Sequence, residues 1–328
     1  MPRTAIPMND KQSMLVTGAT GFIGRAFCQL LIQKSYSVRG TMLSHEASTS
    51  LVDGVEPVLV EPLGPETSWK QALVGIDTVV HLAARVHMMD DPAADPLVEF
   101  RKANVAGTLK LACDAATQGV RRFVFISSVK VNGEESAIPY NSDSRPEPCD
   151  PYGISKWEAE QELRRIEAEM GIEVVIVRPT LVYGPAVKAN FLNILKIISK
   201  GVPLPLASVN NRRSLVYLGN LVDALAVCAV HPGAAGKTYL VSDGEDVSTP
   251  ELILRIANSM NTTARLFPFP AVLLLAAARM VGKRSVVQRL TGSLQVDSSK
   301  IRKDLNWVPP YTMMQGLQET GQWFLTGR

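Results

Sequence analysis

The sequence predicts an α/β fold in which a parallel sheet is covered by helices on both faces. Three observations predict this class. Apolar, β-branched runs typical of strands alternate with helical patterns through the first half of the 328-residue chain. These runs are continuously apolar, as expected for strands that are buried on both sides. A glycine-rich turn, "GATGFIG" at residues 18–24, connects the first strand to the first helix.

The elements of the first half follow in the order that a doubly wound sheet requires. Strands are expected at residues 14–17, 36–42, 57–60, 78–84, 121–128 and 173–179. Helices are expected at residues 22–34, 66–74, 95–118 and 152–170. Beyond Pro179 the pattern changes to helices near residues 189–200, 219–231 and 250–260, with short strands between them. The second half is therefore expected to form a smaller, mixed α/β lobe.

Composition and charge narrow the class of protein. Lysine and arginine exceed aspartate and glutamate by only 34 to 31, and neither sign forms a long block, which argues against nucleic-acid binding. The four cysteines are far apart and fit reduced cytoplasmic thiols better than disulfides or zinc ligands. The N-terminal segment lacks the apolar core of a signal peptide. We expect a cytoplasmic protein with a small-molecule partner.

The longest apolar run covers residues 270–282 and is shorter than the ~20 residues that span a bilayer. No integral membrane span is therefore predicted. The run is expected to form a buried or dimer-facing helix, and peripheral membrane contact remains an alternative.

The glycine turn predicts dinucleotide binding. In a unit of strand, turn and helix, the first glycine permits the tight turn, the second lets the backbone approach a pyrophosphate, and the third lets helix and strand pack closely. Gly18, Gly21 and Gly24 have this context. The unpaired amides at the start of the following helix favour phosphate binding. The predicted cofactor contacts in this turn are Gly18, Thr20, Gly21, Phe22, Ile23 and Gly24.

A second group of residues predicts proton transfer. Tyr152 and Lys156 in "PYGISK" lie four residues apart at the start of a helix, so both side chains project from one face. A nearby ammonium favours the phenolate and lowers the pKa of the tyrosine. Ser128 ends the fifth predicted strand, at the edge where doubly wound sheets bind ligands, and its hydroxyl can orient a substrate oxygen. The adjacent Ser127 is assigned a structural or secondary contact.

Together these motifs resemble the extended short-chain dehydrogenase/reductases. The resemblance rests on the GxxGxxG spacing, on "FVFISS" with "PYGISK", on "NVAGT" and on "RPTLVYGP", and it covers nearly the whole chain. It implies catalytic roles for Ser128, Tyr152 and Lys156. The further cofactor contacts that it implies are Leu63, Leu82, Ala83, Ala84, Asn104, Tyr152 and Lys156. The expected parts are a leader (1–12), an NAD(P)-binding Rossmann-type domain (13–179) and a nucleotide-sugar-binding lobe (180–328), between which the chain can cross back.

The cofactor is predicted from the second strand. NAD-binding proteins of this type carry an acidic residue at its end that binds the adenosine ribose, whereas "VRGTMLSHE" has Thr41 to Ser44 there. Without that carboxylate a ribose phosphate is not repelled, and Arg39, Ser44 or His45 are candidates to bind it. At "VEPLG" Pro62 replaces an aspartate that commonly contacts adenine in the family. NADPH is therefore preferred over NAD.

Stretches of the second half resemble nucleotide-sugar-binding members of the family. "KANFL" matches a segment that contacts the nucleotide, and "NRRSLVYLGNLVDA" matches one that carries a phosphate-binding arginine. Guanidinium groups suit diphosphate oxygens, and the spacing selects Arg213, with Arg212 as the alternative. A UDP-sugar is the implied substrate. Its expected contacts are Ser128, Lys188, Asn190, Phe191, Arg213 and Arg289.

Two reactions at sugar C4 remain open. The runs "SSVKVNGE", "GPAVKANF" and "RRSLV" resemble bacterial enzymes of surface-polysaccharide (O-antigen) synthesis, especially reductases that make UDP-N-acetylquinovosamine, and also UDP-glucose 4-epimerase-like proteins. Reduction of a UDP-4-keto-6-deoxy-N-acetylhexosamine is favoured by these runs and by the missing carboxylate at the end of the second strand. Epimerisation of UDP-glucose or UDP-N-acetylglucosamine with a retained NAD is the alternative. Dehydration is disfavoured because Val129 and Lys130 replace the acidic pair of the dehydratases. A non-catalytic dinucleotide-sensing protein is the third hypothesis.

Oligomeric state and metal content are also predicted. The helices at 95–118 and 152–170 resemble the pair through which relatives form homodimers. No metal is expected, because no ligand spacing occurs among His81, His87, Asp90 and Asp91.

Overall fold

The computed structural model describes residues 12–47, 50–86, 95–280 and 284–327. The chain divides into two compact units. Unit 1 consists of Met1–Ser127, Ile154–Ile176 and Leu225–Lys237, and unit 2 consists of Ser128–Gly153, Val177–Ala224 and Thr238–Arg328. Except for Gln12, the predicted leader lies outside the described residues. The assignment of cofactor and substrate binding to residues 13–179 and 180–328 stays a prediction.

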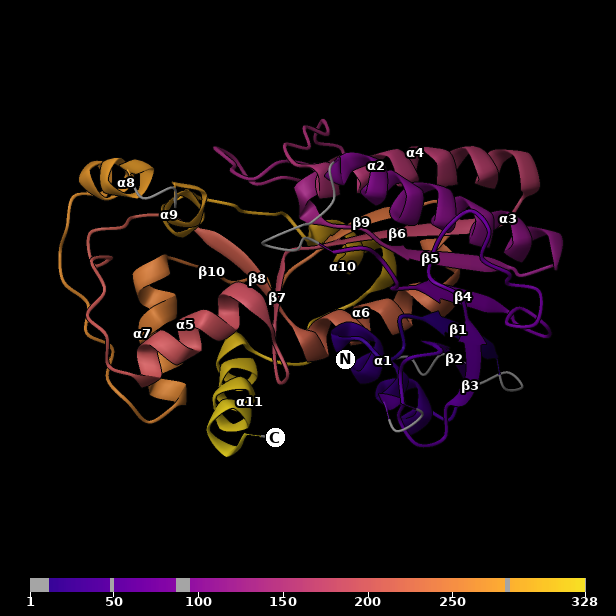
Figure 1. The fold of residues 1–328 in the computed structure, drawn as a ribbon, viewed down its shortest axis with the longest axis horizontal. Coiled ribbons are helices and arrows are strands. Elements are labelled where there is room, and N and C mark those ends of the chain that lie inside the picture. The colour runs from indigo at the N-terminus through magenta and orange to yellow at the C-terminus, as the bar shows by residue number, and fades with distance from the viewer. Residues whose placement is uncertain (1–11, 48–49, 87–94, 281–283, 328) are drawn as a thin grey trace. The chain divides into compact units, whose positions relative to one another are not determined.

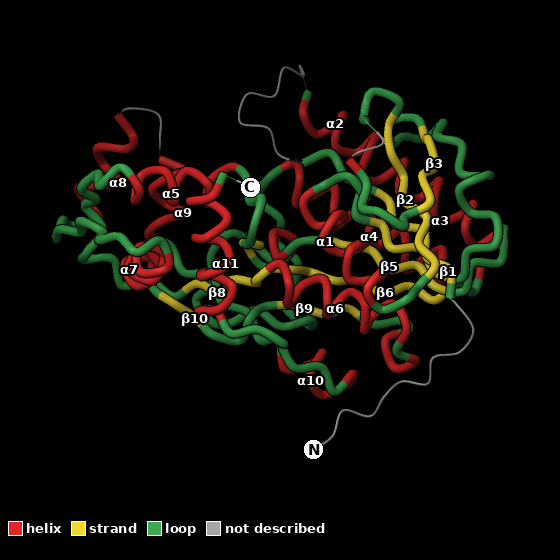
Figure 2. The backbone as a smooth tube through the Cα atoms, turned by 90° about the horizontal axis from the view of Figure 1, so that it is seen from below, coloured by secondary structure: helices red, strands yellow, loops and turns green. Residues whose placement is uncertain are grey.

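The predicted Rossmann-type sheet is confirmed. Seven strands pair in the order β3-β2-β1-β4-β5-β6-β9 (Figure 1). They are β1 (Ser13–Thr17), β2 (Ser37–Leu43), β3 (Glu56–Val60), β4 (Thr78–His81), β5 (Arg122–Ile126), β6 (Glu173–Pro179) and β9 (Thr238–Val241). The pairings from β3 to β5 are parallel, and Figure 2 shows β3, β2 and β1 beside one another. Strand order reverses at β1, so the loops after β1 and β4 lie at the switch point where such sheets bind ligands.

Helices cover both faces of the sheet in unit 1. Figure 1 shows α3 (Thr108–Thr117) and α4 (Pro151–Met170) over one face and α1 (Phe22–Gln33) over the other. The helix predicted at 95–118 is confirmed with an irregularity, because α2 (Pro96–Phe100) continues into a π-helix at Arg101–Gly107 before α3. π-helical turns inside α-helices are frequent at functional sites. This one contains Asn104, one of the predicted cofactor contacts.

The helix predicted at residues 66–74 is wrong, because this segment forms a series of turns. The Thr67 hydroxyl donates to the Pro62 carbonyl at 2.8 Å and accepts from the Gly64 amide at 2.9 Å. Threonine side chains that bond to nearby backbone compete with helix formation. Trp69 is nevertheless buried in the core of unit 1. The apolar spacing of the segment therefore reflects burial and not helical winding.

Unit 2 contains a second, three-stranded sheet in the order β10-β8-β7, formed by β7 (Leu181–Tyr183), β8 (Arg213–Tyr217) and β10 (Asp246–Val247). The three helices predicted in this half are confirmed as α5 (Ala189–Ser199), α6 (Leu218–Val230) and α7 (Thr249–Ser259). The remaining helices are α8 (Ala271–Met280), α9 (Arg284–Thr291), α10 (Ser299–Leu305) and α11 (Met313–Thr326). Helix α11 packs against α7, β7 and β8, and Gly316 lets it approach the ring of Tyr217 closely.

Residues 271–280 of the apolar run form α8, and Val281 and Gly282 lie outside the described residues. The expectation that this helix is buried within the chain is wrong for one face of α8. On that face Val272 and Met280 are 77% and 84% exposed. Across the described ranges, no helix has the length and hydrophobicity to cross a membrane.

Candidate active site

The glycine turn has the backbone geometry that dinucleotide binding predicts. Gly18 has a φ of +65°, a conformation that side chains with a Cβ rarely adopt, and the Gly21 amide donates to its carbonyl at 3.0 Å. A Cβ on Gly24 would lie 2.0 Å from the Gly18 carbonyl oxygen. The chain at Gly18 and Gly24 is therefore too close for any larger residue. The amides at the start of α1, including that of Phe22, form the potential phosphate-binding end.

The loop after β4 is fixed to the glycine turn by one hydroxyl. Thr17, the last residue of β1, accepts hydrogen bonds from the amides of Leu82 and Ala83, both at 3.1 Å. Gly18 is packed so closely that a Cβ there would lie 2.9 Å from the Ala83 nitrogen. Two predicted cofactor segments are thus brought together at the switch point. Ala84 follows in the same loop and is half-buried.

His81 is a buried structural residue. Its Nδ1 lies 2.7 Å from the Thr17 hydroxyl, and its Nε2 lies 3.0 Å from the Thr108 hydroxyl. Since the Thr17 oxygen already accepts two amides, its proton is assigned to His81 Nδ1, which leaves the Nε2 proton for Thr108. Burial, with a contribution from the Lys156 ammonium, lowers the pKa of His81 to about 3. The ring therefore stays neutral at ordinary pH.

No group of three or more potential metal ligands occurs in the part of the chain that the structure describes. His87, Asp90 and Asp91 lie outside the described residues.

Asn104 fixes the next stretch of the same loop. It is buried, accepts from the Arg85 amide at 2.8 Å and donates to the Arg85 carbonyl at 3.0 Å. Its amide also donates to the Ser155 hydroxyl at 3.1 Å, which connects the π-helix to α4. Leu63 packs against Gly107 at the end of the π-helix, where a Cβ would lie 2.8 Å from the leucine Cγ. Asn104 therefore holds the backbone at Arg85 in place, and Leu63 packs against the end of the π-helix. Both residues fix the backbone around the predicted cofactor site.

Lys156 lies under the end of β5. Its ammonium donates to the Ile126 carbonyl at 2.9 Å and lies 4.4 Å from the centroid of the Phe125 ring. Burial lowers the pKa of Lys156 to about 7, and the Glu160 carboxylate opposes this shift. A lysine that titrates near neutral pH can take part in proton relay as well as in electrostatic stabilisation.

Sequence reasoning missed a carboxylate beside the glycine turn. Glu46, three residues beyond β2, accepts from the Leu43 amide at 2.7 Å and from the Thr20 hydroxyl at 2.7 Å. The carboxylate thus lies at the end of the second strand, where a ribose-binding acid is expected. Glu46 is the last residue of "VRGTMLSHE". The turn that folds it back onto the end of β2 cannot be read from the sequence, because it is a tertiary feature.

Arg39, which the sequence suggests as a ligand of a ribose phosphate, is bound to other groups of the protein. The Arg39 guanidinium donates to the carbonyls of Ala72 and Val74 at 3.0 and 2.9 Å, and it pairs with Glu56 at 3.1 Å. Arg39 therefore holds the turns before β4. The carboxylate of Glu46 would repel a ribose phosphate, so the physical argument for NADPH no longer holds.

Two serines follow β5. The Ser127 hydroxyl is buried and has no hydrogen-bond partner among residues 12–47, 50–86, 95–280 and 284–327. An unsatisfied buried hydroxyl indicates a bound ligand or water. Ser127 is therefore a candidate ligand contact, whereas the sequence predicts only a structural or secondary contact for it. Ser128 is half-buried, and its oxygen accepts from the Lys130 amide at 3.2 Å.

Tyr152 lies in the first turn of α4, next to a charged cluster of unit 2. Burial and then the Asp150 carboxylate raise the pKa of Tyr152, which is opposite to the direction that proton transfer requires. Asp150 also accepts from the Gly153 amide at 2.7 Å and so fixes the start of the helix. The Lys130 ammonium pairs with Asp150 and, at 3.0 Å, with Glu134. Lys130 is therefore paired with the carboxylate that opposes ionisation of Tyr152.

Two predicted phosphate-binding arginines meet in unit 2. The Arg213 guanidinium donates to the carbonyls of Arg289 and Gly292 at 2.7 and 2.9 Å. Arg289 in turn pairs with Glu134 at 3.6 Å. Burial lowers the pKa of Arg213; Glu134 opposes this shift, and the neighbouring Arg289 adds to it. Arg212 is exposed, so of the two adjacent arginines only Arg213 lies in this cluster.

The segment before α5 has an unusual backbone. Ala186 and Ala189 have φ values of +68° and +50°, and alanine in this conformation is strained. Lys188, between them, and Asn190 are exposed. Phe191 is buried and stacks on Tyr183 with the ring centroids 5.5 Å apart. Its side chain belongs to the core of unit 2, whereas Lys188 and Asn190 remain available to a ligand.

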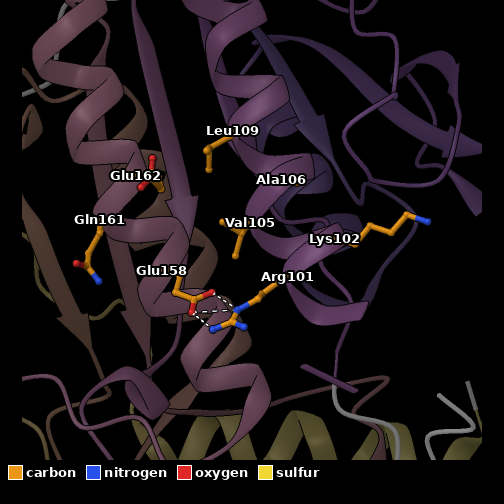
Figure 3. A pocket seen from close by; sticks show the side chains of 8 residues that line it. All are labelled: Arg101, Lys102, Val105, Ala106, Leu109, Glu158, Gln161 and Glu162. Atoms are coloured by element: carbon orange, nitrogen blue, oxygen red, sulfur yellow. Dashed lines mark hydrogen bonds and ion pairs between the residues drawn. The ribbon is translucent and has the colours of Figure 1, made fainter. Parts of the chain in front are cut away.

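The two helices that are predicted to form a dimer interface carry a surface hollow of about 500 Å³ in unit 1. Figure 3 shows the hollow between the π-helix with the start of α3 and the helix α4. Val105 and Leu109 line it from one side and Gln161 from the other, and the ion pair between Arg101 and Glu158 crosses it.

Comparison with known proteins extends these observations. UDP-glucose 4-epimerase of Vibrio cholerae is 42% identical to the chain over 317 residues, which cover 96% of both proteins. N-acetyl-α-D-glucosaminyl-diphospho-ditrans,octacis-undecaprenol 4-epimerase of Escherichia coli O157:H7 is 28% identical over 330 residues, again 96% of both. The structure of UDP-glucuronic acid 4-epimerase from Bacillus cereus in complex with NAD superposes with a TM-score of 0.75 at 21% identity, covering 96% of this chain and 99% of that one.

The family model of NAD dependent epimerases and dehydratases matches residues 14–242, a range that begins in β1 and ends just after β9. It therefore includes the glycine turn, both serines and the start of α4. The chain belongs to the NAD dependent epimerase/dehydratase family.

Proposed function

We propose that the protein is a UDP-sugar 4-epimerase that retains NAD. The observation that carries the choice of cofactor is the Glu46 carboxylate at the end of β2, which fits a free ribose and repels a ribose phosphate. The 42% identity to a UDP-glucose 4-epimerase supports the choice of reaction. Because Glu46 lies at this strand end, the missing-carboxylate argument for the reductase does not hold, and epimerisation is preferred.

The described residues fit NAD. Gly18 and Gly24 permit the tight turn that leads from β1 into α1, and the amides at the start of α1 suit the charge of a diphosphate. Glu46 would bind the adenosine ribose, and Lys156 the nicotinamide ribose. When bound, NAD supplies the hydride acceptor and donor for sugar C4 and a positive charge on its oxidised ring.

Proton transfer is assigned to side chains of this chain. Tyr152 accepts the C4 hydroxyl proton through its phenolic oxygen and returns it after the sugar has turned. Ser128 orients the C4 oxygen by hydrogen bonding. Because burial and Asp150 raise the pKa of Tyr152 in the chain alone, the reaction needs nearby positive charge, from Lys156 and from the oxidised cofactor, to lower it.

The diphosphate of the UDP-sugar is assigned to the arginine cluster of unit 2. The Arg213 guanidinium donates to the backbone carbonyl of Arg289, so two residues that are far apart in the sequence lie next to each other. Guanidinium groups bind diphosphate oxygens in a fixed geometry. Lys188 and Asn190 are further proposed contacts.

The second candidate is reduction of a UDP-4-keto-6-deoxy-N-acetylhexosamine. It is favoured by the runs "SSVKVNGE" and "GPAVKANF". This reaction uses the same Ser128, Tyr152 and Lys156, but it consumes one exchangeable NADH for each sugar.

One assay separates the two reactions. The purified protein is denatured to measure released NAD, and the native protein is incubated with UDP-glucose or UDP-N-acetylglucosamine without added cofactor. The epimerase is expected to release about one NAD per chain and to invert C4, as followed by NMR. Stoichiometric oxidation of NADH with a UDP-4-keto-6-deoxy sugar, without inversion of either substrate, would establish the reductase instead.

Tyr152→Phe is the matched catalytic variant. Loss of the proton-transfer group is expected to lower kcat by about 10² to 10⁴ while the NAD content stays unchanged. A kcat equal to that of the wild type would remove Tyr152 from the mechanism. NAD retention without turnover of any of these sugars in the wild type would favour the dinucleotide-sensing hypothesis.

We further propose a homodimer in the cytoplasm. A second copy packed over the hollow between α3 and α4 would cover Val105 and Leu109. Light scattering of Leu109→Glu, with its expected shift from dimer to monomer, tests the interface.

The cysteines support the proposed cytoplasmic location. None of Cys28, Cys113, Cys149 and Cys228 forms a disulfide, and reduced thiols are typical of the cytoplasm.

A further inference from the structure

We propose that α8 is a docking surface for an anionic lipid bilayer, with the helix lying in the membrane interface and not crossing it. This inference goes beyond the proposed reaction and does not rest on it. The surface is defined by Val272, Leu273, Ala276 and Met280, bordered by Arg279, and is called the α8 face below.

The α8 face is apolar and continuous. Val272, Leu273 and Met280 are 77%, 55% and 84% exposed, and Ala276 is exposed as well. At 100° per residue these four positions fall within one third of the helix circumference. Leu274 and Leu275 lie on the other side and are half-buried. The helix therefore presents Val272, Leu273 and Met280 outward, which is unfavourable in water and marks an interaction surface.

Within unit 2, the position of α8 leaves this face open. Helix α8 packs mainly against α9, and Figure 1 shows the two helices side by side at the edge of the unit. A short amphipathic helix of this kind can insert its apolar side into the boundary between lipid headgroups and acyl chains. Its ten residues are too few to span a bilayer.

The charge of the surrounding sequence selects a lipid surface as the partner. Residues 252–296 contain no aspartate or glutamate, although the whole chain is nearly balanced in charge. The same stretch carries six basic residues in the sequence. Two of them are already paired with carboxylates, Arg255 with Glu245 and Glu251 and Arg289 with Glu134. The proposed attraction therefore rests on Arg265 and Arg279. Arg279 borders the α8 face, and Arg265 is exposed before the helix. Basic residues beside an exposed apolar helix are complementary to anionic headgroups, to which each contributes attraction.

Vesicle flotation of the full-length protein tests the proposal. Vesicles of phosphatidylethanolamine with 30% phosphatidylglycerol, about the anionic content of a charged membrane, are compared with vesicles of phosphatidylcholine alone. Binding is expected to be at least about tenfold stronger to the anionic vesicles and to weaken as salt rises from 0.05 to about 0.5 M. Equal or absent binding to both vesicle types would overturn the proposal.

Two variants locate the binding surface. The double variant Val272→Glu with Leu273→Glu is expected to lose vesicle binding by about tenfold or more while the midpoint of thermal unfolding and the turnover of soluble substrate are kept. The matched control is Val308→Glu, which also places a carboxylate on a well-exposed valine of unit 2 but outside the acid-free stretch, and should bind like the wild type. Arg279→Gln is expected to reduce binding by a few fold and to flatten its salt dependence.

The competing occupant is a second copy of the chain. If the double variant converts a dimer to a monomer in light scattering, and the wild type does not float with anionic vesicles, the α8 face is a protein interface and the lipid proposal is wrong. Unchanged vesicle binding by the double variant would also refute it, because the apolar face would then be unnecessary.

Discussion

The glycine turn of unit 1 and the charged cluster of unit 2 show two ways of building a binding site. The turn is made by the backbone of seven consecutive residues, where Gly18 and Gly24 permit a close approach that a single Cβ would prevent. The cluster is made by side chains, and it joins Lys130, Asp150 and Glu134 to arginines from distant elements. The first depends on local backbone geometry and the second on tertiary folding, so they should respond differently to substitution.

The largest effect is expected from filling the glycine turn. Gly24→Ala would place a methyl group 2.0 Å from the Gly18 carbonyl oxygen, so the backbone must move. Overpacking of this kind costs about 3 kcal/mol, and because the turn loses the geometry that fits the diphosphate, NAD affinity is expected to fall by about 100-fold. Thermal unfolding and calorimetric titration with NAD measure the two effects.

Gly64→Ala is the control for the glycine turn, because a Cβ there meets nothing closer than 3.8 Å. Its stability and NAD affinity should stay near those of the wild type. Equal losses in both variants would mean that the turn is not specifically constrained.

The next effect concerns the carboxylate that joins this turn to β2. Glu46→Gln removes the charge but keeps the shape, and NAD affinity is expected to fall about tenfold while NADP affinity rises, because the repulsion of a ribose phosphate is lost. Glu56→Gln, which loses only its pairing with Arg39, is the matched control. Retention of full preference for NAD by Glu46→Gln would show that another group selects the cofactor.

In the charged cluster, Lys130→Met should change the pH dependence of catalysis. The Asp150 carboxylate raises the pKa of Tyr152, and the Lys130 ammonium is paired with that carboxylate. Without Lys130 the pKa of Tyr152 rises further, so the midpoint of the kcat profile for the step that uses the phenolate should move to higher pH, by about 0.5 to 1 unit. Lys130→Arg should restore the profile. A profile that does not move would place Lys130 in a purely structural role.

The last variant tests the packing of unit 2 away from the cluster, where no effect on NAD binding is expected. A Cβ on Gly316 would lie 2.6 Å from the Tyr217 ring. Gly316→Ala is expected to destabilise the protein by about 1 to 2 kcal/mol, measured by denaturant unfolding, without a change in NAD affinity. A loss of NAD affinity comparable to that of Gly24→Ala would contradict the separation of local and long-range sites.

Much of unit 1 could be predicted from residue order. The strands β1, β4 and β5 are short apolar runs with few alternatives, and the glycine spacing restricts the turn between β1 and α1. The turns at residues 66–74 were mispredicted because burial of Trp69 imitates a helical pattern. The π-helix around Asn104 also has no sequence signal of its own, since its geometry depends on contacts with Arg85 and Ser155.

The sequence by itself determined the fold class, the family and the candidate catalytic residues, because strand patterns, glycine turns and residues one helical turn apart are restricted by the local chain. Only the tertiary structure decided where Glu46 lies, that Arg213 meets Arg289 and that the apolar side of α8 faces outward. These features depend on residues that are distant in the chain and converge only when packing fixes them. For the same reason the end of β2 taken alone predicts NADPH, whereas the turn beyond it places Glu46 where its carboxylate would repel a ribose phosphate.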